Sequence, residues 1–536
     1  MNLLPLKKIL NHRSETILGA GILTSGLTLI GSLFGVLRNA LLASHFGASG
    51  SLDIYYASFR LPDLIYNVFI MGAISVVFIP IFTEYWNKDH QKAWQLTNTI
   101  IVSIGLVVGF SALLIAIFAN FLLSRILVGF SSEKISVAVS LTRLMMIQPV
   151  ILGISSVVSG VLRVFKMFFI SALAPLIYNL GIIVGIVYLV PIFGLKGLAY
   201  GVILGALGHL FIQLPSLATT SYQANFSFKI FKETAEGMKK IFQMIGPRLL
   251  GIISYQLFLV GITAVATLLK EGSLAIFNFA NDLQNLPQNV FALSFALAAF
   301  PRLSELDAQK DKAGFFEVYK DTFNQILFFL VPLAVWLIVF REPIVRLLLG
   351  YGRFNWSATL STMEVLFILS LSMVFSGISQ FLLRVFFAKK DTWRPFWASA
   401  FSYSLGLLIS YHLSLTLGVK GLAVGVSITN LFNFLFLYFL LKPKLAVNLK
   451  DHFWLKTTKI IFLSLISGFL GHCSLILLSR IFPFQHVINL IFSTIISFAF
   501  SMLSFVFGAL FFKIEEVYFL KKIIISKFFY GRKKRE

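Results

Sequence analysis

Charged residues lie inside apolar stretches that are long enough to cross a membrane. Arg38, Arg60 and Arg248 each interrupt such a stretch, and so do Asp63 and Asp282. A charged side chain at the centre of a bilayer costs about 2.5–3.5 kcal/mol on insertion scales, so each of these residues needs a partner or a function. A guanidinium group stays charged and can hold two phosphate oxygens at once. Several arginines around one cavity would therefore suit a diphosphate.

Each of these charges also has an ordinary structural explanation. Arg60 and Asp63 are three residues apart on either side of Pro62, a spacing that allows an ion pair within one helix. Arg38 could extend towards a lipid headgroup, and Arg248, close to the end of a predicted span, fits that explanation better. Both explanations stay open at the level of sequence, and an ion pair does not exclude a position in a cavity.

The sequence contains no motif for catalysis. It has no Walker A loop, no HExxH and no GxSxG, and its one cysteine, Cys473, excludes a disulfide framework and a cysteine-based metal cluster. We therefore expect no enzymatic activity and no bound cofactor. Transport without a nucleotide site would have to use a coupling cation or the membrane potential, which supplies about 2.3 kcal/mol for each charge moved through 100 mV.

The composition identifies the class of protein that positions these charges. Of the 536 residues, 58% are apolar and only 12% are charged. An average soluble domain has about 25% charged residues, so a soluble globular protein is excluded, and a disordered chain is excluded by the same figures. We expect an all-α polytopic membrane protein, because helices satisfy their own backbone groups in lipid.

Fourteen stretches are long and apolar enough to span a bilayer, which takes about 20 residues. The first is too long for the apolar core of a signal peptide and has no cleavage pattern after it, so we expect it to remain. The predicted spans are 17–43, 54–83, 96–121, 136–162, 168–191, 197–219, 241–269, 273–301, 322–340, 357–387, 395–416, 421–441, 457–479 and 487–512.

The basic residues predict the orientation of the chain. If the N-terminus is cytoplasmic, 32 of the 45 lysines and arginines lie on the cytoplasmic side and 9 lie on the opposite side. This bias follows the positive-inside rule, and an even number of spans then places both termini in the cytoplasm. The net charge of +23 includes a basic tail, 513–535, which we expect to lie on anionic lipid and not on nucleic acid.

The chain also repeats itself. Four short matches recur in the same order at offsets of 221 to 224 residues, the clearest being 50–54 with 272–276 and 194–199 with 418–423. A repeat with an even number of spans keeps its orientation in the membrane, so two lobes related by an axis along the membrane normal can enclose a cavity and rock.

The repeat predicts how the chain is divided. It gives two pseudo-symmetric six-helix lobes, residues 1–225 and 226–445, with 446–536 adding two further helices and the basic tail. Twelve helices are enough for the repeat, so the two extra ones favour a lipid substrate over a water-soluble one.

Residues 35–85 carry a resemblance to a known family. They contain G-V-L-R-N-A-L-L-A-S-H-F-G, then L-D-I-Y-Y-A-S-F-R-L-P-D-L, then G-A-I-S-V-V-F-I-P-I-F-T-E-Y. This pattern resembles the N-terminal signature of the MurJ (MviN) lipid II flippases, and weaker matches extend the resemblance over about residues 15–445. The resemblance implies the multidrug/oligosaccharidyl-lipid/polysaccharide exporter fold, with fourteen helices in two lobes.

The resemblance further implies a function in peptidoglycan biosynthesis, and hence in cell-wall biogenesis and cell shape. Family members move an undecaprenyl-diphosphate-linked precursor from the inner to the outer leaflet of the bacterial inner membrane. Arginines in the cavity of the first lobe are thought to grip its diphosphate. Arg38 matches one such position, Arg60 matches a basic position before a proline, and Asp53 matches an acidic position near the outer end of span two.

The chain also departs from the family's pattern. Ser32, Tyr66 and Asp282 stand where arginines are expected, Asn39 stands where an aspartate is usual, and Ile262 occupies a position that is often acidic. Charge-assisted hydrogen bonds contribute about 1.5–3 kcal/mol each, so three missing cations weaken the expected grip on a diphosphate. The predicted substrate-binding residues are Arg38, Asn39, Asp53, Arg60, Asp63, Arg248 and Asp282.

Three alternatives to a lipid II flippase stay open. The first is a flippase for another polyprenyl-linked glycan, and the second is a cation-coupled small-molecule exporter of the same fold, with Asp63 or Asp282 as its functional acid. The third is a membrane scaffold that transports nothing. The leading hypothesis names a polyprenyl-diphosphate-linked precursor and membrane lipids as the partners of a monomeric chain.

Overall fold

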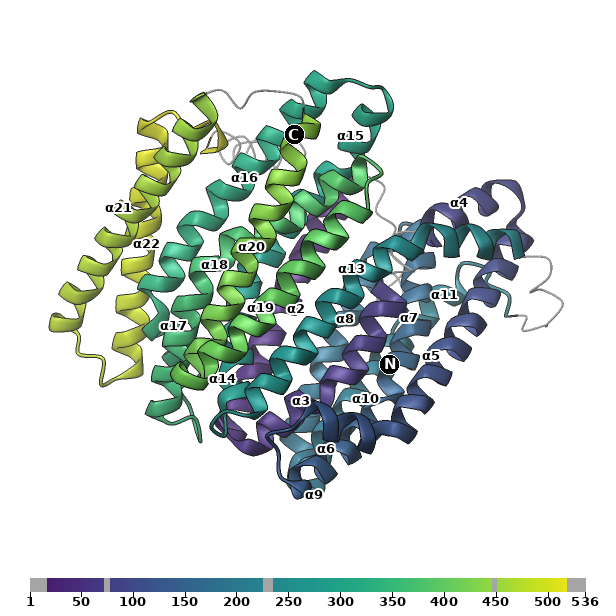
Figure 1. Ribbon diagram of the computed structural model, residues 1–536, viewed down its shortest axis with the longest axis horizontal. Helices are drawn as coiled ribbons and strands as arrows, with labels where there is room; N and C mark the ends of the chain where they lie inside the picture. The colour runs from purple at the N-terminus through teal and green to yellow at the C-terminus, as the bar shows by residue number, and fades with distance from the viewer. Residues whose placement is uncertain (1–16, 72–77, 225–234, 446–450, 518–536) are drawn as a thin grey trace, which may run out of the picture. The chain divides into compact units, whose positions relative to one another are not determined.

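The computed structural model describes residues 17–71, 78–224, 235–445 and 451–517 (Figure 1). Within these ranges every regular element is a helix, which confirms the predicted all-α class. Long apolar stretches form helices here because a helix pairs its own backbone groups where water is absent.

Thirteen of the elements lie before residue 268. They are α2 (Ile17–Phe46), α3 (Gly50–Tyr66), the π-helix η1 (Asn67–Met71), α4 (Ile79–Lys88), α5 (His90–Ile126), α6 (Ser132–Met145), α7 (Ile147–Val164), α8 (Phe168–Val184), the π-helix η3 (Gly185–Leu189), α9 (Val190–Phe193), α10 (Lys196–Phe211), α11 (Leu214–Ala218) and α13 (Ala235–Thr267).

The remaining elements follow Gly272. They are α14 (Ser273–Pro287), the π-helix η4 (Gln288–Leu293), α15 (Ser294–Ala308), α16 (Lys312–Val339), α17 (Arg341–Leu349), α18 (Trp356–Ala388), α19 (Trp393–Leu417), α20 (Val419–Leu445), α21 (Asp451–Ile481) and α22 (Val487–Phe511).

Twelve helices in the described residues are long and apolar enough to cross a membrane, so the predicted count of fourteen is not confirmed. The two predicted spans without a counterpart are 54–83 and 273–301. In the first, α3 carries Pro62 and passes into η1, and in the second, α14 ends at Pro287 and passes into η4. A proline and a π-helix do not by themselves exclude a span, because Phe168–Phe193 contains both and is counted as one. Residues 72–77 of the first segment lie outside the described ranges.

The backbone repeats at the offset found in the sequence. The π-helices η1 and η4 begin at Asn67 and Gln288, which are 221 residues apart. Gly194 and Gly418, 224 residues apart, both adopt a positive φ, of 57° and 59°. This left-handed conformation is readily available to glycine, which explains why both copies of the motif begin with it.

The described chain forms two compact units, and their limits do not coincide with the predicted boundary at residue 225. The first unit comprises 1–276 together with 351–355 and 414–422, and the second comprises the remaining residues. Helix α13 belongs to the first unit because it packs on α3 and α5. The first unit therefore extends past the predicted boundary.

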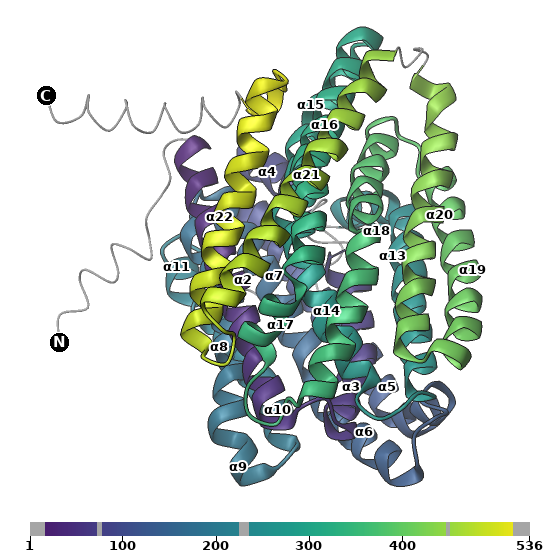
Figure 2. The same cartoon turned by 90° about the vertical axis from the view of Figure 1, so that its left-hand side faces the viewer.

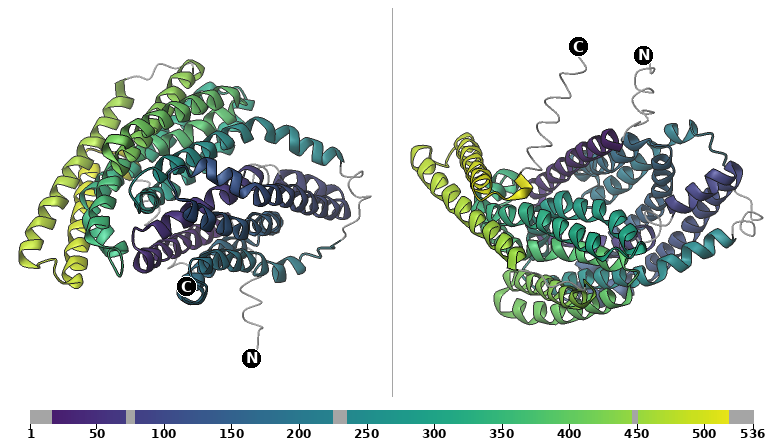
Figure 3. Two further views of the ribbon diagram at one scale, coloured as in Figure 1. Left: turned by 60° about the horizontal axis from the view of Figure 1, so that its bottom comes forward. Right: turned by 90° about the horizontal axis from the view of Figure 1, so that it is seen from above.

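The last two helices belong to the second unit. α21 and α22 pack against each other along their length, and α21 also packs on α16 (Figure 2). The pair, coloured yellow-green to yellow, stays together in every view (Figure 3). Their outward side chains, such as Phe469 and Phe507, are exposed apolar groups, as expected of a surface that faces lipid.

Glycines join α8 to α10 inside the first unit. A Cβ at Gly181 would lie 2.2 Å from the Cα of Gly205, and one at Gly185 would lie 2.6 Å from the Cα of Gly201. Small residues let helix backbones approach this closely, and helices in membranes associate through such contacts. These contacts fix one side of α8 on α10, and α2 also packs against α8.

Candidate substrate-binding site

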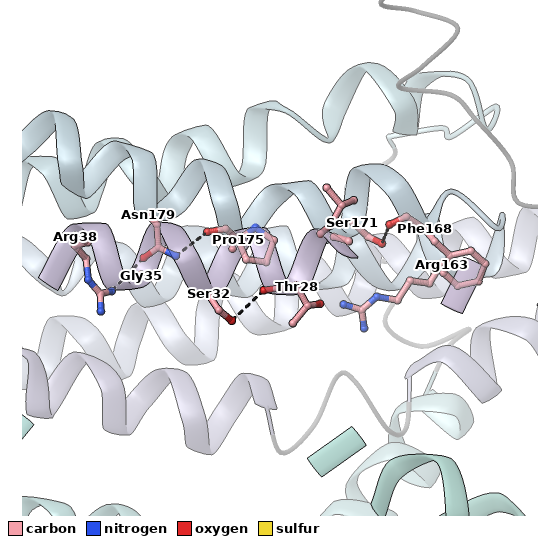
Figure 4. Close-up of a pocket in the computed structure, with 12 residues that line it drawn as sticks. Thr28, Ser32, Gly35, Arg38, Arg163, Phe168, Ser171, Pro175 and Asn179 are labelled. Carbon is pink, nitrogen blue, oxygen red and sulfur yellow. Dashed lines mark hydrogen bonds between the residues drawn. The ribbon is translucent and has the colours of Figure 1, made fainter. Parts of the chain in front are cut away.

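A cavity of about 530 Å³ lies along α2 and α8 in the first unit (Figure 4). On α2, Thr28, Ser32 and Gly35 face it together, because residues three and four apart share one face of a helix. A Cβ at Gly31 or Gly35 would meet nothing within 4 Å, so these glycines leave the space open. The lining residues are Leu27, Thr28, Gly31, Ser32, Gly35, Arg38, Arg163, Phe168, Ser171, Ala172, Pro175 and Asn179.

Arg38 lies at one end of this cavity and is held by two amide side chains. Its Nη1 donates to Oδ1 of Asn179 on α8 at 3.1 Å. Its Nε and Nη2 donate to Oδ1 of the neighbouring Asn39 at 3.2 and 3.0 Å. Amide oxygens orient the guanidinium plane and carry no formal charge, so these bonds leave the positive charge of Arg38 in place.

Arg163 lies towards the other end of the same cavity, near Thr28 (Figure 4). It belongs to the last turn of α7 and is exposed. Sequence reasoning assigned it to a cytoplasmic loop and did not select it as a site residue. The only available signal was its place in the repeated segment 162–165, which recurs as 383–386.

The chemistry of the cavity suits an anion. Its twelve lining residues include two arginines and no carboxylate. Hydroxyl groups lie between the two arginines, among them that of Ser32, whose Oγ donates to the Thr28 carbonyl at 3.0 Å (Figure 4). Guanidinium and hydroxyl donors bind phosphate oxygens, whereas a metal cation would require oxygen or nitrogen ligands without nearby positive charge.

Arg60, the second arginine of the prediction, is not among the residues that line this cavity. Its Nε donates to Oγ1 of Thr263 on α13 at 2.7 Å. Thr263 is fully buried, and its own hydroxyl donates to the Leu259 carbonyl at 2.9 Å. Arg60 thus connects α3 to α13, and the structure does not bring it together with Arg38 at one cavity.

Asp53 is occupied by backbone groups. It is 4% exposed, and its two carboxylate oxygens accept hydrogen bonds from the N–H groups of Gly272 and Ala275 at 2.6 and 2.8 Å. A carboxylate at the first turn of a helix stabilises it. Asp53 thus caps α14 and lies outside the cavity lining, as does Asp63, which is half-buried on α3.

The other predicted positions fall in three places. The side chain of Arg248, on α13, lies outside the described residues. Asp282 is half-buried on α14 in the second unit. Among the positions where an arginine was expected, Ser32 lines the cavity and Tyr66 does not. Ile262, where an acid was expected, is a buried core residue of α13.

A sequence model described as lipid II flippase MurJ matches residues 42–507, most of the chain. The chain belongs to the MurJ family. A relative from Thermotoga maritima, described as a probable lipid II flippase MurJ, is 28% identical over 418 residues, which is 78% of this chain and 84% of the relative. The lipid II flippase MurJ of Burkholderia cenocepacia is 25% identical over 434 residues, or 78% of this chain and 83% of that protein.

Solved structures agree on the fold. A structure titled lipid II flippase MurJ, inward closed conformation, superposes with a TM-score of 0.74 at 24% identity, covering 92% of this chain and 99% of that one. An inward-facing multidrug resistance transporter of the MATE family, in the MOP superfamily, superposes with a TM-score of 0.65 at 15% identity, covering 79% and 98%. The chain shares the fold of these two structures, as the sequence resemblance implied.

Proposed function

We propose that this chain moves lipid II, the undecaprenyl-diphosphate-linked peptidoglycan precursor, from the inner to the outer leaflet of the bacterial inner membrane. Membership of the MurJ family supports the substrate. The observation that carries the proposal is the cavity along α2 and α8, where Arg38 is held in place by Asn39 and Asn179. The diphosphate binds to Arg38 in this cavity.

The geometry of Arg38 suits this role. Its guanidinium is fixed by hydrogen bonds from two directions before any substrate arrives, so little side-chain entropy is lost on binding. Each charge-assisted hydrogen bond to a phosphate oxygen contributes about 1.5–3 kcal/mol, since the surrounding helices replace water with a less polar medium.

Both termini of the proposed transporter are cytoplasmic, as the positive-inside bias predicts. Transport proceeds by alternating access, in which the two lobes predicted from the repeat rock between an inward-open and an outward-open state. The energy comes from a coupling cation or from the membrane potential, and the chain catalyses no chemical reaction. The polyprenyl tail stays in contact with apolar surface, part of which α21 and α22 provide.

Complementation tests the proposal. A strain depleted of its own lipid II flippase should grow when it expresses the wild-type chain or Arg143→Ala, because Arg143 is exposed and donates to the Ala116 carbonyl outside the cavity. Arg38→Ala at equal expression should fail to support growth and should accumulate lipid II in the inner leaflet. Failure of the well-expressed wild type would contradict the proposal, and accumulation of a different polyprenyl-linked glycan would identify the first alternative.

A further inference from the structure

The two arginines of the cavity lie at different levels along α2. Arg163 approaches the cavity near Thr28, whereas Arg38 is ten residues further along the helix (Figure 4). A helix rises 1.5 Å per residue, so Thr28 and Arg38 are separated by about 15 Å along its axis. A diphosphate is much shorter than this distance. The arginines therefore form two separate cationic positions and not a single clamp.

Arg163 differs from Arg38 in its partners. Within the described residues, its guanidinium takes part in no hydrogen bond and no ion pair, and it is exposed to the cavity. A guanidinium has five N–H donors in a planar fork that matches phosphate oxygens. The side chain is thus available to a ligand without first breaking a bond inside this part of the protein.

A cation at the end of a helix has an ordinary structural use, and the second repeat shows it. Arg384 is the counterpart of Arg163 in the repeated segment, and its Nη1 donates to the Gln380 carbonyl at 2.8 Å, one turn back on α18. Such a bond holds the side chain against its own helix, where it adds a second donor to a carbonyl of the α-helical ladder. Arg163 makes no such bond in the described structure and points into the cavity instead (Figure 4).

Polar groups connect the two positions. Thr28 and Ser32 line the cavity between the two arginines, Ser171 lies at the Arg163 end (Figure 4), and Gly31 and Gly35 leave the space open. A hydroxyl group can donate to a phosphate oxygen without holding it as strongly as a guanidinium does. The Ser32 hydroxyl has one hydrogen and donates it to the Thr28 carbonyl at 3.0 Å, so an anion moving along this face of α2 would have to take that donor from the carbonyl.

We propose that Arg163 is an entry site for the diphosphate of a lipid headgroup, occupied before the diphosphate reaches Arg38. This inference rests on the proposed function, and specifically on the orientation that places the C-terminal end of α7 on the cytoplasmic side. The substrate's diphosphate binds to Arg163 on entering from the inner leaflet, passes the hydroxyl groups of α2 and then binds to Arg38. Two cations at separate levels replace the denser cluster that the family pattern predicted.

Cysteine protection can resolve the two positions. The chain has a single cysteine, so Cys473→Ser gives a cysteine-free background. In it, Thr28→Cys reports on the Arg163 end, and Gly35→Cys, where a Cβ meets nothing within 4 Å, reports on the Arg38 end. Farnesyl diphosphate, a short polyprenyl diphosphate, should slow maleimide labelling at both positions. Farnesol, which lacks the diphosphate, should not slow the labelling. Inorganic pyrophosphate, which lacks the lipid, separates the contribution of the headgroup from that of the lipid.

The inference predicts a separable effect of each arginine. Arg163→Gln should reduce protection at Thr28→Cys at least fivefold and leave protection at Gly35→Cys unchanged. The unchanged protection at Gly35→Cys would also show that the variant is folded. Arg38→Gln should do the reverse, and Arg163→Lys should keep part of the protection at Thr28→Cys. The matched control is Lys166→Gln, which removes an equal charge from an exposed residue outside the cavity lining. It should change the protection at neither Thr28→Cys nor Gly35→Cys.

Several results would overturn the entry site. One is full protection at Thr28→Cys in the Arg163→Gln variant, and another is an equal loss in Lys166→Gln, which would indicate only a surface-charge effect. Absence of protection at Thr28→Cys, in a chain that still protects Gly35→Cys and complements growth, would also reject the entry site while leaving the proposed function intact. Failure of the wild-type chain to complement would instead reject the proposed function.

Discussion

Asp53 binds the residue that occupies its own position in the second repeat. Its Oδ1 accepts a hydrogen bond from the backbone N–H of Ala275 at 2.8 Å, and residues 50–54 and 272–276 are the matching segments Gly-Ser-Leu-Asp-Ile and Gly-Ser-Leu-Ala-Ile. Its Oδ2 accepts from Gly272 at 2.6 Å. Only the first copy has the aspartate, so it caps the helix that begins in the second copy.

Replacing this carboxylate should weaken the first unit. Asp53→Asn keeps the shape and one acceptor, but it removes the negative charge at the first turn of α14 and leaves one N–H without its acceptor, at a cost of about 1–3 kcal/mol. We expect a lower melting temperature in detergent. Asp89→Asn is the matched control, because Asp89 caps α5 from an exposed position and asparagine serves equally well there. Equal melting temperatures for the two variants would contradict a stabilising role for Asp53.

Asn179→Asp should impair substrate binding without impairing folding. Asn179 already accepts a hydrogen bond from Arg38, and a carboxylate at the same place would form an ion pair with the guanidinium and compete with the diphosphate. We expect at least a tenfold lower affinity for farnesyl diphosphate, measured as protection at Gly35→Cys. Asn179→Gln, which keeps a neutral acceptor, serves as the control. If Asn179→Asp bound the diphosphate as well as wild type does, Arg38 would not be its ligand.

Thr263→Val should lower stability, because it removes the acceptor of the Arg60 Nε hydrogen bond at 2.7 Å and leaves a charged donor without it. The expected loss is about 1–3 kcal/mol, seen as a lower melting temperature. Thr362→Val is the control, since Thr362 is equally buried and its described bond goes only to the Ala358 carbonyl of its own helix. Because Arg60 does not line the cavity, protection at Gly35→Cys should stay unchanged, and a selective loss of that protection would place Arg60 in the binding site.

Gly205→Ala should separate α8 from α10. A Cβ at this position would lie 2.4 Å from the backbone oxygen of Tyr178, and backbone atoms cannot move aside as a flexible side chain can. Overpacking of this kind costs about 1–3 kcal/mol, so the melting temperature should fall and the cavity wall on α8 should shift. Gly105→Ala, where the Cβ meets nothing within 4 Å, should leave stability equal or slightly higher. Equal behaviour of the two variants would show that α8 and α10 are not in close contact.

The sequence was sufficient for the properties that depend on local composition. Apolar length against bilayer thickness predicted the all-helical membrane class, and the motifs around Arg38 predicted the family and one residue of the cavity. The count of fourteen spans stays a prediction at 54–83 and 273–301, because neither segment is among the twelve described helices that are long and apolar enough to cross a membrane.

Only the tertiary structure determined which charges share a space. Arg60 was predicted beside Arg38 and instead binds Thr263, while Arg163, which looked like a loop residue, lies in the cavity with Arg38. The sequence gives the spacing of residues on one helix, but the face that each helix turns to its neighbours depends on packing along its whole length. In this chain the direct glycine contacts between α8 and α10 contribute to that packing, and they place Asn179 where it can orient Arg38.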